Sequence, residues 1–334
     1  MDRAYFFLRR VGQSLLVVAL TYVFVFYVLF LLPGDPVKSR IENPQNPIPA
    51  EQAAAILEYY NLDRDGLEQF WLSVTRLFQG DLGYSLGTGR PVAELIGDGF
   101  AETITLAALA LVLALAFALA VAATAVLAPW RWARALADKL PVVALATPGF
   151  LVGLVLLQVF AYQLGWFSSI RDEGLKSLLL PALTLAVGVS APIAQVLIHG
   201  LRHAYTEPFV AVLRAKGVPE SRIFGGHALK NASIPALTLF GLTVGELLAG
   251  SVIAEAVFNR SGLGFITEQA VRAQDGPVVQ AVVMLVAVIF TTINLVTDLL
   301  YPAIDKRVAA KVIGVRKSSA PGARPTNPQE VPVP

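Results

Sequence analysis

The sequence places one carboxylate deep inside a long apolar run, where an ionisable side chain is energetically expensive. Glu246 lies near the middle of the run Ala236–Val257. A carboxylate at that depth must face a polar cavity, find a partner or stay protonated. We therefore expect Glu246 to line a path for a polar solute. The alternative is a buried acid that is hydrogen-bonded to a neighbouring helix.

Three other acids lie near the ends of apolar runs, where a side chain can reach water at a membrane surface. They are Glu102, Glu255 and Asp298. Simple anchoring and a role in transport both stay open for these residues, because an end position costs less than a central one.

Two histidines have the spacing of metal ligands on one helix face. His199 and His203 lie four residues apart. No glutamate accompanies them as a general base, and no third ligand is apparent. Imidazoles also suit the C-terminal end of a helix. We favour that second interpretation and predict no metal site, and the absence of cysteine excludes thiolate ligands and cysteine nucleophiles.

The chain has no sequence with which to bind and hydrolyse ATP. A Walker A motif requires a Gly-Lys dipeptide, and none occurs in the sequence. We therefore predict no catalytic residues and no enzymatic activity. Energy for transport must come from a partner subunit or from an ion gradient. An intramembrane enzyme would need paired catalytic groups, and Glu246 has no obvious mate.

The composition determines what must position these residues. The 334 residues are 55% hydrophobic and 15% charged, which is far too apolar for a soluble chain. Leucine and alanine dominate without an alternating strand pattern, so we expect an all-α polytopic membrane protein. Six apolar runs are long enough to span a bilayer as helices: Phe6–Leu32, Ile104–Leu127, Leu140–Leu164, Leu178–Ile198, Ala236–Val257 and Val278–Leu300.

These runs divide the chain into four parts. Residues 1–32 form the first span, 33–100 an external region, 101–307 a five-span core with a cytoplasmic loop at 200–235, and 308–334 a disordered tail. In the external region we expect helices over Ala50–Tyr60 and Gly66–Phe78, then a turn-rich stretch at Gly80–Ser85. Shorter connections are predicted at Ala128–Lys139 and Phe258–Pro277.

The distribution of basic residues predicts the orientation. With the N-terminus in the cytoplasm, 17 lysines and arginines fall in cytoplasmic segments and nine in external ones. Basic residues favour the cytoplasmic side of a membrane. We therefore expect both termini and the loop at 200–235 to be cytoplasmic.

That loop has the pattern of two short helices joined by a glycine. Thr206 is the expected N-cap of the first helix, which carries an apolar edge, and Gly217 is expected to end it in a left-handed conformation. Pro219 begins a second helix that carries Ile223 and Phe224. Such a pair can dock into a groove of a partner. A generic amphipathic helix at the membrane surface is the alternative.

The residues of this loop resemble those of a known family. Arg214–Val218 and His227–Asn231, followed by Pro235, are similar to the cytoplasmic loop in permease subunits of binding-protein-dependent ABC importers. The branch resembled is that for dipeptides, oligopeptides or nickel. The wider superfamily begins the loop with Glu-Ala-Ala, whereas Ala211–Leu213 stands here. Further similarities occur at Leu31–Pro36 and Gly80–Ser85, so the resemblance extends from Arg9 to about Arg307.

The resemblance implies a type I ABC importer permease in a bacterial inner membrane. Its partners would be a second permease, two cytoplasmic ATPases that hold ATP and Mg, an external binding protein and membrane lipid, without nucleic acid. The expected cargo is a di- or oligopeptide, with nickel or another small solute as the alternative. An ion-driven transporter remains a rival, although it usually shows repeats with broken helices, and none is seen in the sequence.

The resemblance also implies roles for particular residues. The loop residues expected to dock on the ATPase are Glu207, Phe209, Val212, Leu213, Arg214, Ala215, Lys216, Gly217, His227 and Asn231. A peptide carries opposite charges and amides, so its path needs polar groups, for which the candidates are Glu246, Gln195 and Glu255. The family often has arginine where Gln195 stands. Glu255 begins a Glu-x-x-Phe sequence of the family, which suggests a structural role at the outer mouth.

Overall fold

The computed structural model describes residues 3–31, 58–60, 65–168 and 173–304. Within these ranges the chain is helical, and its one β-pairing is an isolated bridge between Tyr84 and Pro91. The predicted all-α class is confirmed. The predicted tail 308–334 and the start of the predicted helix at Ala50 lie outside the described residues.

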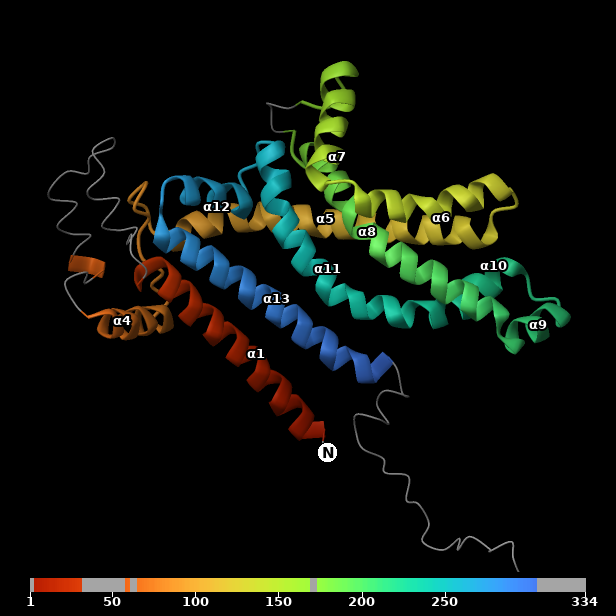
Figure 1. Cartoon of the computed structure of the whole chain (residues 1–334), viewed down its shortest axis with the longest axis horizontal. Coiled ribbons are helices and arrows are strands. Elements are labelled where there is room, and N and C mark those ends of the chain that lie inside the picture. The colour runs from red at the N-terminus through yellow and green to blue at the C-terminus, as the bar shows by residue number, and fades with distance from the viewer. Residues whose placement is uncertain (1–2, 32–57, 61–64, 169–172, 305–334) are drawn as a thin grey trace, which may run out of the picture.

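The fold is organised around the long helix α8 (Leu175–Thr206), which lies against α5 (Val92–Leu127) and α11 (Leu229–Val257) (Figure 1). These elements extend the second, fourth and fifth predicted spans beyond their expected ends. Because α8 is covered on several sides, most of its apolar residues are buried.

A seam of small residues joins α5 to α8. Every fourth residue of α5 is fully buried along this seam: Leu106, Ala110, Ala114, Ala118 and Ala122. The i, i+4 spacing places them on one face of the helix. Methyl side chains let two helix backbones approach closely, so packing rather than polar contact holds this pair together.

The predicted third span over Leu140–Leu164 is not one continuous helix. The chain instead forms α6 (Arg131–Ala146) and α7 (Gly149–Leu156), and α7 continues as the π-helical segment Leu157–Gln163. The chain direction bends by 105° between α6 and α7. Thr147 is extended at the bend, because Pro148 disfavours the helical conformation in the residue before it.

Two predicted connections also contain helix. The predicted loop Ala128–Lys139 is wrong for most of its length, since α6 already begins at Arg131. The segment between the fifth and sixth predicted spans contains the helix α12 (Leu263–Arg272), which the sequence did not indicate. In both cases a helix lies where a connection between spans was predicted.

The first and last helices lie side by side at one edge of the molecule (Figure 1). They are α1 (Arg3–Phe26), which ends in the π-helical turn Tyr27–Leu31, and α13 (Gly276–Ile304). The predicted helix over Gly66–Phe78 is confirmed as α4 (Gly66–Phe78), which packs on α1 through Phe26 and Phe70, whose ring centroids lie 5.3 Å apart.

The turn-rich stretch is tied to the start of α13. Ser85 donates a 2.5 Å hydrogen bond from its hydroxyl to the buried Asp275 carboxylate, and the Gly87 amide donates to the same oxygen at 3.1 Å. Gly80 and Gly83 have positive φ angles, as expected of turns. Hydrogen bonds therefore fasten this stretch to the start of α13, far away in the sequence.

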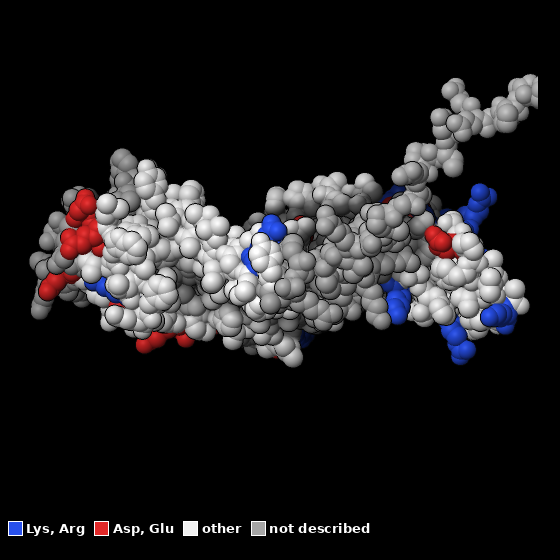
Figure 2. Space-filling view, turned by 90° about the horizontal axis from the view of Figure 1, so that it is seen from below, with Lys and Arg blue, Asp and Glu red and all other residues white. Residues whose placement is uncertain are grey.

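By length and apolarity, four described helices could each cross a membrane, and a fifth crossing exists if the bent pair α6–α7 counts as one. The helix α11 covers the fifth predicted span without a break. The prediction of six crossings thus stays a prediction. Figure 2 shows charged side chains mostly at the two ends of the long axis, with basic ones prominent at the end where α9 and α10 lie in Figure 1.

The alanine seam makes a prediction about stability. Ala118→Leu adds three carbons where no space exists, so we expect the free energy of unfolding to fall by about 1–3 kcal/mol. Ala116→Leu, on the exposed face of the same helix, should change the free energy of unfolding little. Thermal unfolding in detergent measures both, and equal midpoints for the two variants would contradict a tightly packed seam.

Candidate functional site

The loop between α8 and α11 forms two short helices, as predicted. They are α9 (Pro208–Ala215) and α10 (Glu220–Ile223), and a π-helical turn (Phe224–Ala228) leads into α11. Gly217 has φ +74° and ends α9 in the left-handed region. Only residues 207–228 of the predicted loop 200–235 therefore lie outside α8 and α11.

The expected N-cap at Thr206 is wrong. Thr206 is the last residue of α8, and its hydroxyl donates a 2.8 Å hydrogen bond to the His203 carbonyl oxygen. The extended residue Glu207 instead separates α8 from α9, and Pro208 occupies the first position of α9. A single residue thus turns the chain, which leaves little slack between the long helix and the loop.

The most deeply buried side chains of the loop helices are Val210, which the sequence interpretation did not name, and Ile223, which it placed on the second helix. Val210 and Ile223 are 1% and 0% exposed. They lie on either side of Gly217, one in α9 and one in α10, and these two short helices contact each other, while α9 also contacts α8. The pattern that could have indicated them is a branched apolar residue inside each helix next to the glycine turn.

The remaining apolar residues of α9 divide between the bundle and solvent. Phe209 and Leu213 are half-buried, whereas Val212 is 52% exposed. The Phe209 ring lies 6.5 Å from the His227 ring, centroid to centroid, so the two halves of the predicted docking motif meet here. The docking candidates that are exposed are Val212, Arg214, Ala215, Lys216, Gly217, His227 and Asn231.

An ion pair spans the glycine turn. The Arg214 guanidinium donates a 2.6 Å hydrogen bond to the Glu220 carboxylate, which lowers the pKa of that carboxyl. The same guanidinium lies 5.7 Å from the centre of the Tyr205 ring at the end of α8. Because both charged groups are exposed, the pair sets the angle between α9 and α10 more than it stabilises the fold.

Glu246 opens onto a cavity of about 470 Å³ beside the break in the third span. Thr147, Pro148 and Gly149 form one wall of this cavity, and α8 and α11 form the others. Glu246 is the only charged residue among those that line it, and no hydrogen bond or ion pair joins it to another described residue. Its surroundings thus favour the path interpretation over a buried, partnered acid.

Gln195 lies outside this cavity but on the same face of α8. Gly188 lines the cavity, and Gln195 follows it by seven residues, which is about two helical turns or 10 Å along the axis. Both residues are exposed, unlike most of α8. Gln195 therefore lies between the cavity and the loop that holds α9 and α10.

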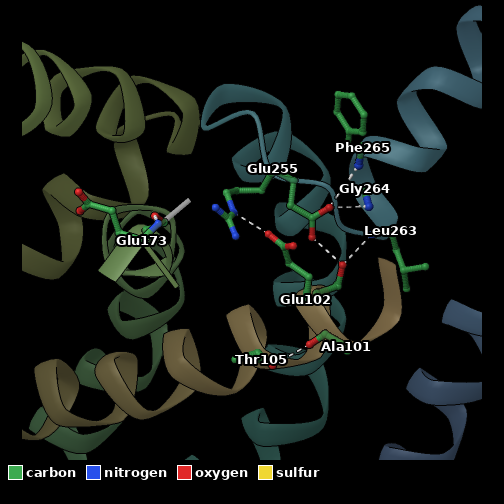
Figure 3. A network of polar contacts seen from close by, with 11 residues as sticks. Ala101, Glu102, Thr105, Glu173, Glu255, Leu263, Gly264 and Phe265 are labelled. Carbon is green, nitrogen blue, oxygen red and sulfur yellow. Dashed lines mark hydrogen bonds and ion pairs between the residues drawn. The ribbon is translucent and has the colours of Figure 1, made fainter. Parts of the chain in front are cut away.

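Glu255 lies on the opposite side of α11 from Glu246. Nine residues separate them, and at about 100° per residue this turns the side chain by half a revolution. Glu255 is fully buried, and its carboxylate accepts hydrogen bonds from the Thr103 hydroxyl at 2.7 Å, the Gly264 amide at 2.7 Å and the Phe265 amide at 3.2 Å (Figure 3). This geometry fits the structural role expected for Glu255 and gives no support to a lining role.

The Glu255 network joins three helices at the end of the molecule away from α9 and α10. Thr103 of α5 donates to Glu255 of α11 and accepts a 2.8 Å hydrogen bond from the Leu263 amide at the start of α12. A Cβ on Gly264 would lie 2.3 Å from the Val252 backbone, so only glycine fits there. Glu102 and Arg260 form an ion pair beside this network.

The histidine pair lies near the end of α8 that leads into α9. His199 and His203 are exposed near the end of α8, and the nearest acid partner is Glu207, 3.4 Å from the His203 ring. No group of three metal-ligating side chains occurs among the described residues.

The Glu255 network predicts that Thr103 is critical for stability. Thr103→Val leaves the Leu263 amide and one Glu255 oxygen without their hydrogen-bond partner, which should cost about 1–3 kcal/mol. Thr105→Val is the matched control, because that exposed hydroxyl bonds only to the Ala101 carbonyl of its own helix (Figure 3). Unfolding midpoints in detergent measure both variants. If Thr105→Val lowers the midpoint as much as Thr103→Val does, the hydrogen bonds of Thr103 do not stabilise the fold in the way proposed.

The sequence is similar to one family along most of its length. Residues 120–310 match the family described as "Binding-protein-dependent transport system inner membrane component". The glutathione transport system permease protein GsiC of Salmonella typhimurium is 36% identical over 298 residues, which cover 89% of this chain and 95% of the relative. The protein of the same name from Escherichia coli K12 is 34% identical over 289 residues, 86% and 94% of the two chains.

Proposed function

The chain belongs to the binding-protein-dependent transport system inner membrane components, and from this premise we propose that it forms half of the path through which an ATP-driven importer carries short peptides. Such a permease works with a second permease, cytoplasmic ATPases and a binding protein. ATP and Mg would be held by the ATPase subunits.

The observation that carries the proposal is the short connection of the loop residues 207–228 to α8 on one side and to α11 on the other. Val210 of α9 and Ile223 of α10 are buried, while Val212 and Lys216 stay exposed for a partner. Glu207 and the π-helical turn leave no long flexible connection on either side. A displacement of the loop by an ATPase would therefore move α8 and α11 directly.

Those two helices carry the proposed polar lining. Gly188 and Gln195 lie on α8, and Glu246 lies on α11. A partner that binds the loop differently in two states can shift the equilibrium between two arrangements of the helices. The same movement would change the cavity beside Thr147–Gly149, where the broken third span can adjust more readily than a straight helix.

The cargo is inferred from charge. A carboxylate that has no partner among the described residues and lies in a mostly apolar cavity attracts a cation, and the α-ammonium group of a peptide supplies one. The relatives named as glutathione permeases suggest a short peptide of that kind. A nickel complex or another cationic solute would suit the same carboxylate and is the second candidate.

Glu246 tests the path and the cargo together. In proteoliposomes with the complete importer, Glu246→Gln should lower the uptake of glutathione about tenfold or more, because an ammonium loses a charge-assisted partner. The matched control is Glu94→Gln, because Glu94 is an exposed acid in the first turn of α5, outside the cavity. If Glu246→Gln is expressed at the level of the parent and takes up glutathione at the same rate, Glu246 does not line the path.

The docking role is tested on the exposed valine of α9. Val212→Asp places a charge on the proposed contact, so we expect the ATPase to be lost when the tagged chain is purified from membranes. Val271→Asp is the control, since that valine is 59% exposed at the far end. Retention of the ATPase by Val212→Asp, or uptake that stops with an uncoupler but not with vanadate, would favour an ion-driven transporter instead.

A further inference from the structure

A patch of stacked tryptophans and unpaired cations occupies the tip of the hairpin formed by α5 and α6. Trp130 and Trp132 are 62% and 67% exposed, and their rings lie 6.2 Å apart, centroid to centroid, with 21° between the planes. The proposed function assigns no role to them. We call this surface the hairpin patch; its members are Trp130, Arg131, Trp132, Arg134 and Lys139.

The cations of the hairpin patch have no ion-pair partner among the described residues. Arg131, Arg134 and Lys139 are exposed, and no ion pair joins any of them to a described side chain. The acid closest in sequence, Asp138, is already bound by Arg202 of α8 through contacts of 2.7 and 2.8 Å. The patch therefore carries an uncompensated positive charge beside two large aromatic surfaces.

The depth of the patch in a membrane follows from α5. The apolar run Ile104–Leu127 rises roughly 36 Å as a helix, slightly more than the roughly 30 Å hydrocarbon core of a bilayer. Trp130 follows its end by three residues, so the tryptophans fall at the level of the lipid headgroups. Tryptophan is enriched at that level because its ring is apolar and its N–H is polar.

We propose that the hairpin patch binds the headgroup of an anionic phospholipid. The planar guanidinium groups of Arg131 and Arg134 can each bind a phosphate through two donors, and the tryptophans supply the apolar contact for the glycerol and upper acyl region. A lipid with net negative charge is favoured over a zwitterionic one, since the three cations have no counter-charge of their own.

Tryptophan quenching by brominated lipid tests the proposal on the full chain in detergent. Trp71→Phe and Trp166→Phe leave only the two tryptophans of the patch. Brominated phosphatidylglycerol should quench them at a several-fold lower mole fraction than brominated phosphatidylcholine. Arg131→Gln with Arg134→Gln should remove this preference, with about a fivefold weakening for each arginine.

The controls separate the possible occupants. Arg222→Gln, an exposed arginine on α10, should leave the lipid preference intact. Equal quenching by the two lipids, or a preference abolished by millimolar inorganic phosphate, would overturn the proposal. So would loss of the ATPase from the Arg131→Gln/Arg134→Gln variant without any lipid preference in the parent, because the patch would then be a protein interface.

Discussion

The close packing of α5 against α8 is the interaction on which the rest of the structure depends. Alanines at every fourth position of α5 bring the two backbones together, and α8 becomes the covered centre to which α11 and α6 attach. Inside a membrane, lipid is as apolar as the helix surface, so close contact rather than exclusion from water must hold such a pair. Small residues supply that contact and leave the larger side chains to face outward.

The two ends of this bundle are held in different ways. At one end the buried Glu255 carboxylate joins α5, α11 and α12, because both of its oxygens accept hydrogen bonds. At the other end α9 and α10 each bury one apolar side chain, Val210 and Ile223, and expose Val212, Arg214 and Lys216. A bundle that is fastened at one end and accessible at the other suits a device driven by a partner subunit.

The break at Thr147–Pro148 lies between these ends and beside Glu246. A straight helix there would close the space that the cavity occupies. The bend turns α7 away from α6, as Figure 1 shows, and leaves the carboxylate next to a wall of irregular backbone. Non-helical backbone at such depth is tolerated only where it lines a cavity or is buried in protein, which agrees with a path at this place.

Much of the molecule was determined by the sequence alone. The length and periodicity of the apolar runs, the glycine turn at Gly217 and the charge of Glu246 are local properties, and each predicted its element or its chemistry. Tertiary structure decided which apolar residues face inward. It buried Val210 and exposed Val212, and it placed Glu246 and Glu255 on opposite faces of α11 in a cavity and a closed network respectively. These outcomes depend on which neighbours cover each helix, and a run that is apolar on every side carries no periodic pattern to indicate its neighbours.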